Sequence, residues 1–191
     1  MDAYFEMMQN SIHRLDDTLK EILDYSRNAR SELSVAPVDL EKLIADSFEK
    51  LRYLPGFDMI RKEVKVAADV PFVSDGYRLS VVFNNLVSNA IKYRDPDKES
   101  YVEIDAVITD AALEFVFRDN GIGIGPDVIH RIFDMFYRAT EKSEGAGLGL
   151  YIVKETIDKM GGSIEVDSKL GEGTAFKVTV PNVIQTAGGQ Q

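Results

Sequence analysis

The chain has 191 residues, 45% of them hydrophobic and 28% charged, which suits one compact core with an appended segment. Its net charge of -10 argues against nucleic acid as a partner, because phosphate backbones are bound by basic surfaces. The chain has no cysteine and no apolar run near the roughly 20 residues of a membrane span, so the sequence favours a cytoplasmic protein with no span in this chain. An anionic ligand would have to be held by local groups, such as backbone N–H groups, helix N-termini, a few cations or a metal ion.

Residues 1–34 carry a regular apolar pattern. Apolar or small side chains recur in steps of three and four, at Phe5, Met8, Ile12, Leu15, Leu19, Ile22, Ser26, Ala29 and Leu33. This 3.5-residue repeat is typical of a helix that packs along a seam against partner helices, and no Gly or Pro interrupts it. We expect a long helix that forms a homodimer or bundle; a surface helix on the following domain is the alternative.

Residues 35–183 mix short helices and strands. Pro37 ends the apolar repeat, and Asp39 is a suitable N-cap for a helix over about 40–52. Further helices are expected at Tyr77–Tyr93, after Pro126 and at Leu148–Met160, and strands at Val64–Val70, Tyr101–Ile108, Leu113–Arg118, Ser163–Asp167 and Ala175–Val180. Helices interspersed with hairpin-like strand pairs predict an α+β, two-layer sandwich, with one mixed sheet and the helices on one face. The Gly- and Gln-rich tail, residues 184–191, is expected to be disordered.

The first candidate site feature is a pair of amides near the end of the helix expected at Tyr77–Tyr93. Asn85 and Asn89 are four residues apart and therefore share one helical face. Their oxygens could serve a Mg²⁺ ion that takes its other ligands from phosphates and water, and Lys92 could reach a phosphate. The alternative is that both are surface amides or helix caps.

The second feature is Asp119-Asn120-Gly121-Ile122-Gly123-Ile124, which directly follows an expected strand. The alternate glycines permit a tight turn and a close backbone approach to a ligand. A carboxylate at the strand end could accept a hydrogen bond from an exocyclic amine such as that of adenine. The same residues also suit a plain turn.

Two further features follow. The aromatic cluster Ile132–Arg138 could cover a ligand or fill a core. Gly145-Ala146-Gly147-Leu148-Gly149-Leu150 opens a helix, and backbone N–H groups at a helix N-terminus bind anions. This loop lacks the Gly-Lys-Ser/Thr ending of a Walker A loop, and no strand leads into it as in a dinucleotide fingerprint.

The ordered set of these four features resembles the N, G1, F and G2 boxes of the histidine-kinase branch of the GHKL ATPase superfamily. The resemblance extends to Gly161-Gly162 and to the stretch Ser168…Gly171-Glu172-Gly173-Thr174-Ala175-Phe176, and it covers about residues 38–182. The leading segment RLDDTLKEILDYSR is similar to the second helix of the dimerisation and histidine-phosphotransfer region of these kinases. The resemblance implies the Bergerat fold and the catalytic, ATP-binding domain of a two-component sensor histidine kinase, with ATP and Mg²⁺ as cofactors.

The resemblance also implies roles for individual residues. It places Asn85, Asn89 and Lys92 in the catalytic machinery, with Asn89 as the Mg²⁺ ligand and Asn85 as a second candidate ligand. It places Asp119 at the adenine amine, Tyr93 beside the ring and Thr174 near the base, and gives Arg138 a phosphate role at the start of the lid. The full set that it places around ATP is Asn85, Asn89, Lys92, Tyr93, Asp119, Gly121, Gly123, Ile124, Phe136, Arg138, Gly145, Gly147, Leu148, Gly149, Leu150 and Thr174.

One residue favours kinase over hydrolase chemistry. ATP-hydrolysing relatives such as gyrase and Hsp90 carry a Glu four residues before the Mg²⁺-binding Asn, whereas this chain has Asn85 there. An amide is too weak a base to activate water, while alignment of a phosphoryl group for transfer needs no such base.

The sequence departs from the family in two places. Neither His13 nor His130 carries the acceptor-site pattern that follows a phospho-accepting histidine, so we expect the acceptor upstream of this chain and a response-regulator receiver domain as the onward partner. The lid segment Ala139–Glu144 is short by family standards, which leaves open a nucleotide-binding regulatory platform without catalytic activity.

Overall fold

A mixed five-stranded sheet forms the centre of the molecule. In the computed structural model, residues 32–138 and 147–184 are described, together with Phe5, Met8, Ile12, Leu19, Ile22, Leu23 and Ser26. The strand order is β2-β4-β5-β7-β6, in which only β2 and β4 run parallel. The strands are β2 (Ile60–Ala68), β4 (Ser100–Ile108), β5 (Ala112–Asp119), β6 (Ser163–Lys169) and β7 (Gly173–Pro181).

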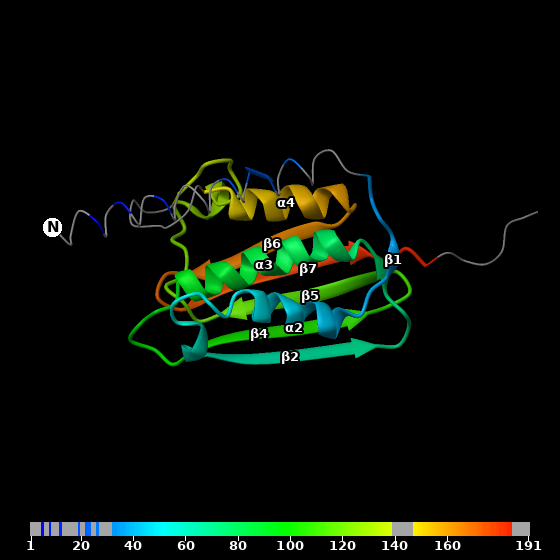
Figure 1. Ribbon diagram of the computed structural model, residues 1–191, viewed down its shortest axis with the longest axis horizontal. Helices are drawn as coiled ribbons and strands as arrows, with labels where there is room; N and C mark the ends of the chain where they lie inside the picture. The colour runs from blue at the N-terminus through cyan, green and yellow to red at the C-terminus, as the bar shows by residue number, and fades with distance from the viewer. Residues whose placement is uncertain are drawn as a thin grey trace, which may run out of the picture.

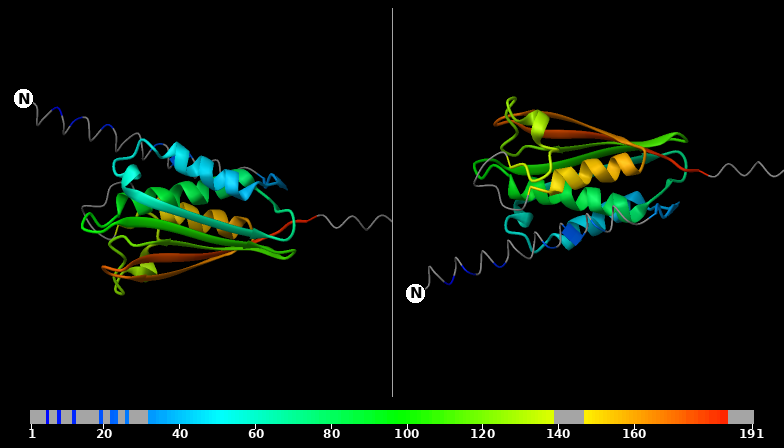
Figure 2. Two further views of the ribbon diagram at one scale, coloured as in Figure 1. Left: turned by 90° about the horizontal axis from the view of Figure 1, so that it is seen from below. Right: turned by 90° about the horizontal axis from the view of Figure 1, so that it is seen from above.

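Three helices cover one face of this sheet (Figures 1 and 2). They are α2 (Leu40–Lys50), α3 (Gly76–Lys92) and α4 (Gly149–Lys159), and α3 lies between the other two and packs against both. Side-chain caps begin α2 and α3: the Asp39 side chain accepts from Lys42 N at 3.0 Å, and the Asp75 side chain accepts from Arg78 N at 3.0 Å. Short 3-10 turns, η1 (Phe57–Met59) and η2 (Ile129–Arg131), occupy the connections.

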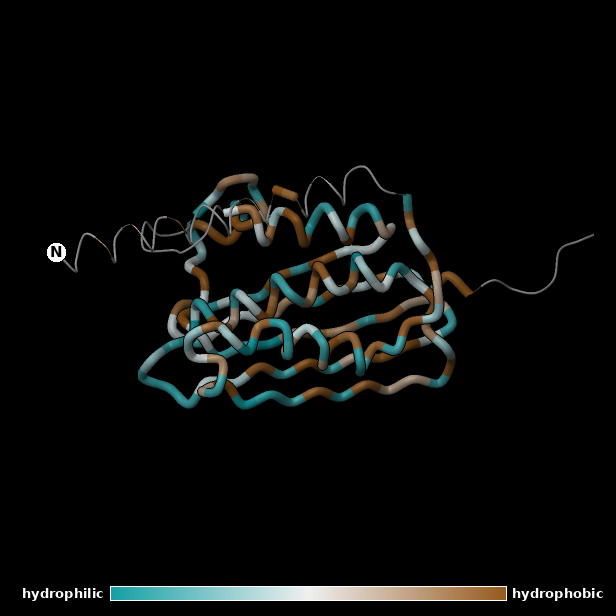
Figure 3. Tube along the Cα trace, viewed as in Figure 1, coloured by the Kyte–Doolittle hydropathy of each residue, from teal (hydrophilic) through white to brown (hydrophobic). Residues whose placement is uncertain are grey.

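The core lies between the helices and the sheet because strand residues alternate between the two faces. Along β4 and β5 every second residue is buried, and Figure 3 shows the alternation as bands of hydrophobic and hydrophilic residues. Phe83 of α3 stacks on Phe115 of β5 with ring centroids 4.8 Å apart. This contact fixes α3, the helix that carries the candidate amides, over the middle of the sheet.

A second, two-stranded sheet joins the incoming chain to the start of α3. Strand β1 (Ala36–Pro37) pairs antiparallel with β3 (Val73–Ser74). Next to it, the buried Asp75 and Arg78 side chains pair with each other, while Asp75 accepts from Ser34 N at 2.9 Å and Arg78 donates to Glu32 O at 3.1 Å. The segment before β1 is therefore tied directly to the N-terminus of α3.

The structure confirms the predicted sandwich and most of its elements, with three corrections. The strand expected at Val64–Val70 runs instead from Ile60 to Ala68; its charged beginning resembles a loop because β2 is an edge strand whose side chains are mostly exposed. The stretch after Pro126 forms a 3-10 turn, η2, where a helix was expected. Leu33, the last position of the N-terminal repeat, lies outside any helix.

The N-terminal helix and the tail lie largely outside the described residues. Of the described seam residues before Leu33, Phe5, Met8, Ile12, Leu19 and Ile22 are helical and exposed, with relative exposures of 67%, 64%, 61%, 58% and 44%, and Ser26 is helical and half-buried. Residues 185–191, for which we expected disorder, are not described. Within the described part of the chain, no helix combines the length and apolar character needed to cross a membrane.

Candidate functional site

A pocket of about 360 Å³ opens between α3, the loop after β5, the start of α4 and the β6–β7 hairpin. Its size and its mixture of apolar and polar walls suit a small organic ligand. It is lined by Asn85, Ser88, Asn89, Lys92, Tyr93, Asp119, Ile122, Gly123, Ile124, Gly125, Asp127, Val128, Ile132, Tyr137, Arg138, Gly147, Gly149, Leu150, Leu170, Thr174 and Phe176.

The α3 wall of the pocket carries the paired amides. Asn85 donates from Nδ2 to Val81 O at 2.8 Å, within its own helix, which leaves its Oδ1 available to the pocket. This oxygen faces the start of α4, because a Cβ added to Gly149 would lie 3.0 Å from it. Asn89 and Lys92 follow on the same wall. Gly149 therefore lets the α4 N-terminus approach the amide oxygen closely.

Asp119 forms a half-buried acceptor at the end of β5. Its Oδ1 accepts from Gly121 N at 2.9 Å. Burial raises the pKa of Asp119 to about 6, while the backbone N–H groups of Gly121 and Thr174 act in the opposite direction. A carboxylate left in a pocket at this cost of desolvation suits a ligand that supplies N–H donors.

The loop after β5 is tied to two neighbouring elements. Ile122 N donates to Tyr93 O at 3.0 Å at the end of α3, and Gly171 N of the β6–β7 hairpin donates to Ile122 O at 2.7 Å. Gly123 has φ +68°, and a Cβ there would lie 2.1 Å from Lys169 O. Only glycine fits this position, because the backbone is left-handed and the hairpin is in contact.

The N-terminus of α4 forms the remaining polar wall. The first helical hydrogen bond runs from Ile152 N to Leu148 O at 2.8 Å, so the helix itself does not use the N–H groups of Gly149 and Leu150. Leu148 is 1% exposed and anchors this end against Val81 and Ile152. With φ +75°, Gly147 packs on the backbone of Phe136 and Tyr137. The helix end is thus held in place to receive an anion.

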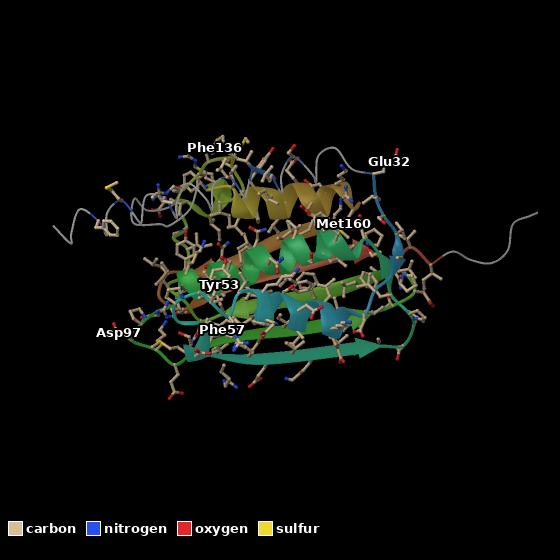
Figure 4. The ribbon with its side chains drawn as sticks, viewed as in Figure 1. Glu32, Tyr53, Phe57, Asp97, Phe136 and Met160 are labelled. Carbon is tan, nitrogen blue, oxygen red and sulfur yellow. The ribbon has the colours of Figure 1, made fainter. Side chains whose placement is uncertain are left out.

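The structure brings most of the predicted ligand residues to one pocket. Gly121 and Leu148 support it from behind rather than lining it. Phe136 is 60% exposed, lies outside the pocket lining and has a left-handed φ of 61° (Figure 4). Gly145 lies outside the described residues.

Several lining residues were not in the predicted ligand set: Ser88, Ile122, Gly125, Asp127, Val128, Ile132, Tyr137, Leu170 and Phe176. Of these, Ile122 lies within the feature that begins at Asp119, and Ile132 and Tyr137 lie within the aromatic cluster for which ligand cover and core filling were both open. Leu170 carried a signal, because an apolar residue at a hairpin tip has no obvious core to enter; it is 67% exposed. Arg131 stacks over the Tyr137 ring, 4.4 Å from its centroid, and so positions a pocket residue from outside.

A divalent cation fits this site only as a partner of a bound ligand. Among the described residues there is no cluster of three or more His, Asp or Glu side chains that could hold a metal. On the α3 wall, the candidate ligands are the amide oxygens of Asn85 and Asn89. Mg²⁺ binds such oxygens while it keeps water and phosphate ligands, so this donor set is compatible with Mg²⁺ bound together with a phosphorylated ligand.

Sequence comparisons connect the chain with kinases. The profile described as "Histidine kinase-, DNA gyrase B-, and HSP90-like ATPase" matches residues 74–184. The chain is 29% identical to sensor histidine kinase AtsR of Burkholderia thailandensis over 182 residues, covering 91% of this chain and 30% of that protein. It is 31% identical to sensor histidine kinase RcsC of Escherichia coli over 191 residues, covering 95% and 20%. The chain thus spans less than a third of the length of these relatives.

Solved structures show the same fold. Full-length ShkA in complex with AMPPNP superposes with a TM-score of 0.75 at 30% identity, covering 94% of this chain and 38% of that one. The mycobacterial sensor histidine kinase MprB superposes with a TM-score of 0.65 at 32% identity, covering 76% of this chain and 97% of that one.

Proposed function

Because the chain belongs to the family of histidine kinase-, DNA gyrase B- and HSP90-like ATPases, as the ATP-binding domain of a sensor histidine kinase, we propose that it transfers the γ-phosphoryl group of ATP to a histidine. The acceptor histidine lies upstream of this chain, and the group then passes to an aspartate of a response-regulator receiver domain. The module works in the cytoplasm as a homodimer formed through the N-terminal helix.

One observation carries the proposal: the pocket contains two chemically different polar ends. The half-buried Asp119 carboxylate offers an acceptor for the amine of a base, and the α4 N-terminus at Gly149 offers N–H groups for phosphates. Lys92 on the α3 wall supplies a positive charge near the same pocket. These features support a nucleotide that spans the pocket with its base at Asp119 and its phosphates at α4.

The protein's own residues then do three things. Asp119, Tyr93 and Thr174 bind and orient the base, Gly147 and Gly149 let the α4 N-terminus approach the phosphates, and Lys92 neutralises phosphate charge. Asn89, with Asn85, would hold Mg²⁺, which on binding supplies charge neutralisation at the transferring phosphoryl group.

The Asn85 contact supports transfer to a histidine over hydrolysis. Its Nδ2 is committed to Val81 O, and an amide oxygen does not take a proton from water near neutral pH. A neutral imidazole already carries a nucleophilic lone pair, so transfer to histidine needs alignment rather than a general base. His130, an exposed residue of η2, is not proposed as the acceptor, because the acceptor-site sequence pattern does not follow it.

The test is calorimetric titration of the chain with ATP and Mg²⁺, followed by transfer to an added protein that carries the acceptor helix. We expect Asp119→Asn to weaken ATP binding by about tenfold or more, because one amide N–H would oppose the base amine. Asp110→Asn, in the exposed β4–β5 turn, is the matched control and should bind normally.

Two outcomes would redirect the proposal. Failure of the folded chain to bind ATP would contradict it altogether. Tight binding without phosphohistidine formation would favour the regulatory platform, whereas transfer that disappears in Asn89→Ala would exclude that alternative.

A further inference from the structure

Three side chains form a polar row across the inner face of the sheet at the pocket. Asp119 of β5 lies opposite Thr174 of β7, and Thr174 lies opposite Ser168 of β6. The row directly continues the apolar row of Phe117, Phe176 and Val166, on the face that the helices cover. Asp119 and Thr174 line the pocket, while Ser168 stands behind Thr174 and does not line it.

The contacts of the Ser168 hydroxyl determine which hydrogen bonds it donates and which it accepts. Ser168 Oγ lies 2.8 Å from Gly173 O, 2.9 Å from Ile124 N and 2.9 Å from Thr174 Oγ1. Gly173 O carries no hydrogen, so Ser168 donates its single proton there, and Ile124 N–H donates to Ser168. The contact with Thr174 then needs a hydrogen from Thr174, which means that the Thr174 hydroxyl donates to Ser168.

This direction leaves the pocket with two acceptors and no side-chain donor at the Asp119–Thr174 pair. The Thr174 hydroxyl hydrogen is used in the bond to Ser168, so the Thr174 oxygen can only accept from a ligand, and the ionised Asp119 can only accept as well. An amino group at position 6 of a purine has two N–H donors and matches this pair. A 6-oxo group would place its lone pairs against those of the Asp119 and Thr174 oxygens. These polar groups would then lack a hydrogen-bond donor in the pocket, which weakens binding strongly.

We propose that Ser168 sets the preference of this site for a 6-amino over a 6-oxo purine, because it accepts the hydrogen bond that the Thr174 hydroxyl donates and so leaves Thr174 only as an acceptor toward the ligand. Ser168 acts on the base only through Thr174 and is a positioning residue. The inference rests on the proposed function, since it assumes that the base of ATP lies at Asp119.

The experiment compares ATP with inosine triphosphate, whose base carries a 6-oxo group in place of the amine and a hydrogen on N1; because both differences are present for every variant, the change in the affinity ratio on substitution is the quantity that tests Ser168. Binding of each nucleotide with Mg²⁺ is measured by calorimetry on the full chain, so that no turnover is needed. We expect Ser168→Ala to lower the ratio of ATP to inosine triphosphate affinity by about tenfold, because Thr174 then becomes free to donate to the 6-oxo group. Any general loosening of the hairpin weakens both nucleotides and cancels in the ratio.

A second variant keeps the test valid if Ser168→Ala does not fold. Thr174→Val removes the hydroxyl with little change of shape and should also lower the ratio. In the double variant the two effects should not add, since both act through one hydroxyl. Ser163→Ala and Thr179→Val are the matched controls: they form a cross-strand pair in the same hairpin but on the opposite face, and should leave the ratio unchanged.

Each result has a distinct meaning. An unchanged ratio in Thr174→Val, or equal losses for both nucleotides in Ser168→Ala, would overturn the inference and leave Ser168 a purely structural residue while ATP binding stands. A wild-type chain that binds neither nucleotide would instead overturn the proposed function.

Discussion

At the scale of single residues, the pocket contains an acidic side chain, Asp119, whose ionisation does not stabilise the ligand-free protein. Burial holds the pKa of Asp119 at about 6, above the ordinary 3.8, so ionisation of this carboxyl opposes folding. A ligand that brings N–H donors to the carboxylate removes part of that cost. The same residue therefore reduces the stability of the free protein and, under the proposed function, would contribute to nucleotide binding.

The pH dependence of stability should show this cost. Because the folded pKa lies above the unfolded one, the stabilising contribution is complete below about pH 3.8 and is lost as pH rises through about 6. The total loss is about 3 kcal/mol, of which roughly 1 to 1.5 kcal/mol falls between about pH 5 and 7.5. Urea unfolding of the wild type and Asp119→Asn across this range measures it as the difference between the two profiles. A free energy of unfolding of the wild type that rises with pH relative to that of Asp119→Asn would contradict the assignment.

At the scale of elements, the pocket depends on loops that are fastened to helix and strand ends. The loop after β5 is hydrogen-bonded to the last turn of α3 through Tyr93 O and to the β6–β7 hairpin through Gly171 N. At its other end, α3 is tied to the incoming chain through Asp75 and Arg78. The Asp75 and Tyr93 ends of α3 are thus both held, so the amides at Asn85 and Asn89 have a fixed position over the sheet.

Two glycines in one loop offer a matched test of this fastening. Gly123→Ala places a methyl group 2.1 Å from Lys169 O on a left-handed backbone, and should cost more than about 2 kcal/mol of stability together with most of the nucleotide affinity. Gly125→Ala, two residues on, meets nothing within 4 Å and has no left-handed φ, so it should change stability by less than about 1 kcal/mol. Thermal unfolding and calorimetry of both variants provide the comparison. Equal effects of the two would show that the loop is not held by the hairpin.

The sequence predicted elements well where one face is buried, and poorly where local pattern carries little information. Helix α3 and strand β4 begin and end within one residue of expectation, because their apolar periodicity is regular and Asp75 caps the helix. Strands β1 and β3 were missed, since two residues are too short for a pattern and their pairing joins distant parts of the chain. The Ser168–Thr174–Asp119 row was missed for the same reason, as cross-strand register is set by tertiary structure.

At the scale of the whole molecule, the exposed apolar side chains of the N-terminal repeat indicate a surface that packs against another helix. Phe5, Met8, Ile12 and Leu19 are each more than half exposed, which is unusual for four large apolar residues at a helical spacing. Some of this surface would be covered in a dimer of this chain, consistent with the proposed homodimer.

Sedimentation velocity tests this assembly. The unsubstituted chain should associate, and Ile12→Glu combined with Leu19→Glu should make it monomeric, because two charges would be buried in the seam. Val107→Glu, at a residue of β4 that is 50% exposed, is the control and should leave association unchanged. A monodisperse monomer of the unsubstituted chain at high concentration would contradict the expected dimer.

The small sheet has a consequence for engineering. Val73 of β3 donates to Asn182 Oδ1 at 2.9 Å and accepts from Val183 N at 2.9 Å, while the neighbouring β1 brings the chain in at Ala36. The points where the chain enters and leaves the sandwich therefore share one two-residue strand. Neighbouring ends of this kind allow a domain to be circularly permuted or inserted into a host loop with a short connection. A reporter fused after Val183 would begin next to β1, where the N-terminal segment joins the sandwich. It would therefore be placed to detect a movement of the N-terminal segment relative to the sandwich.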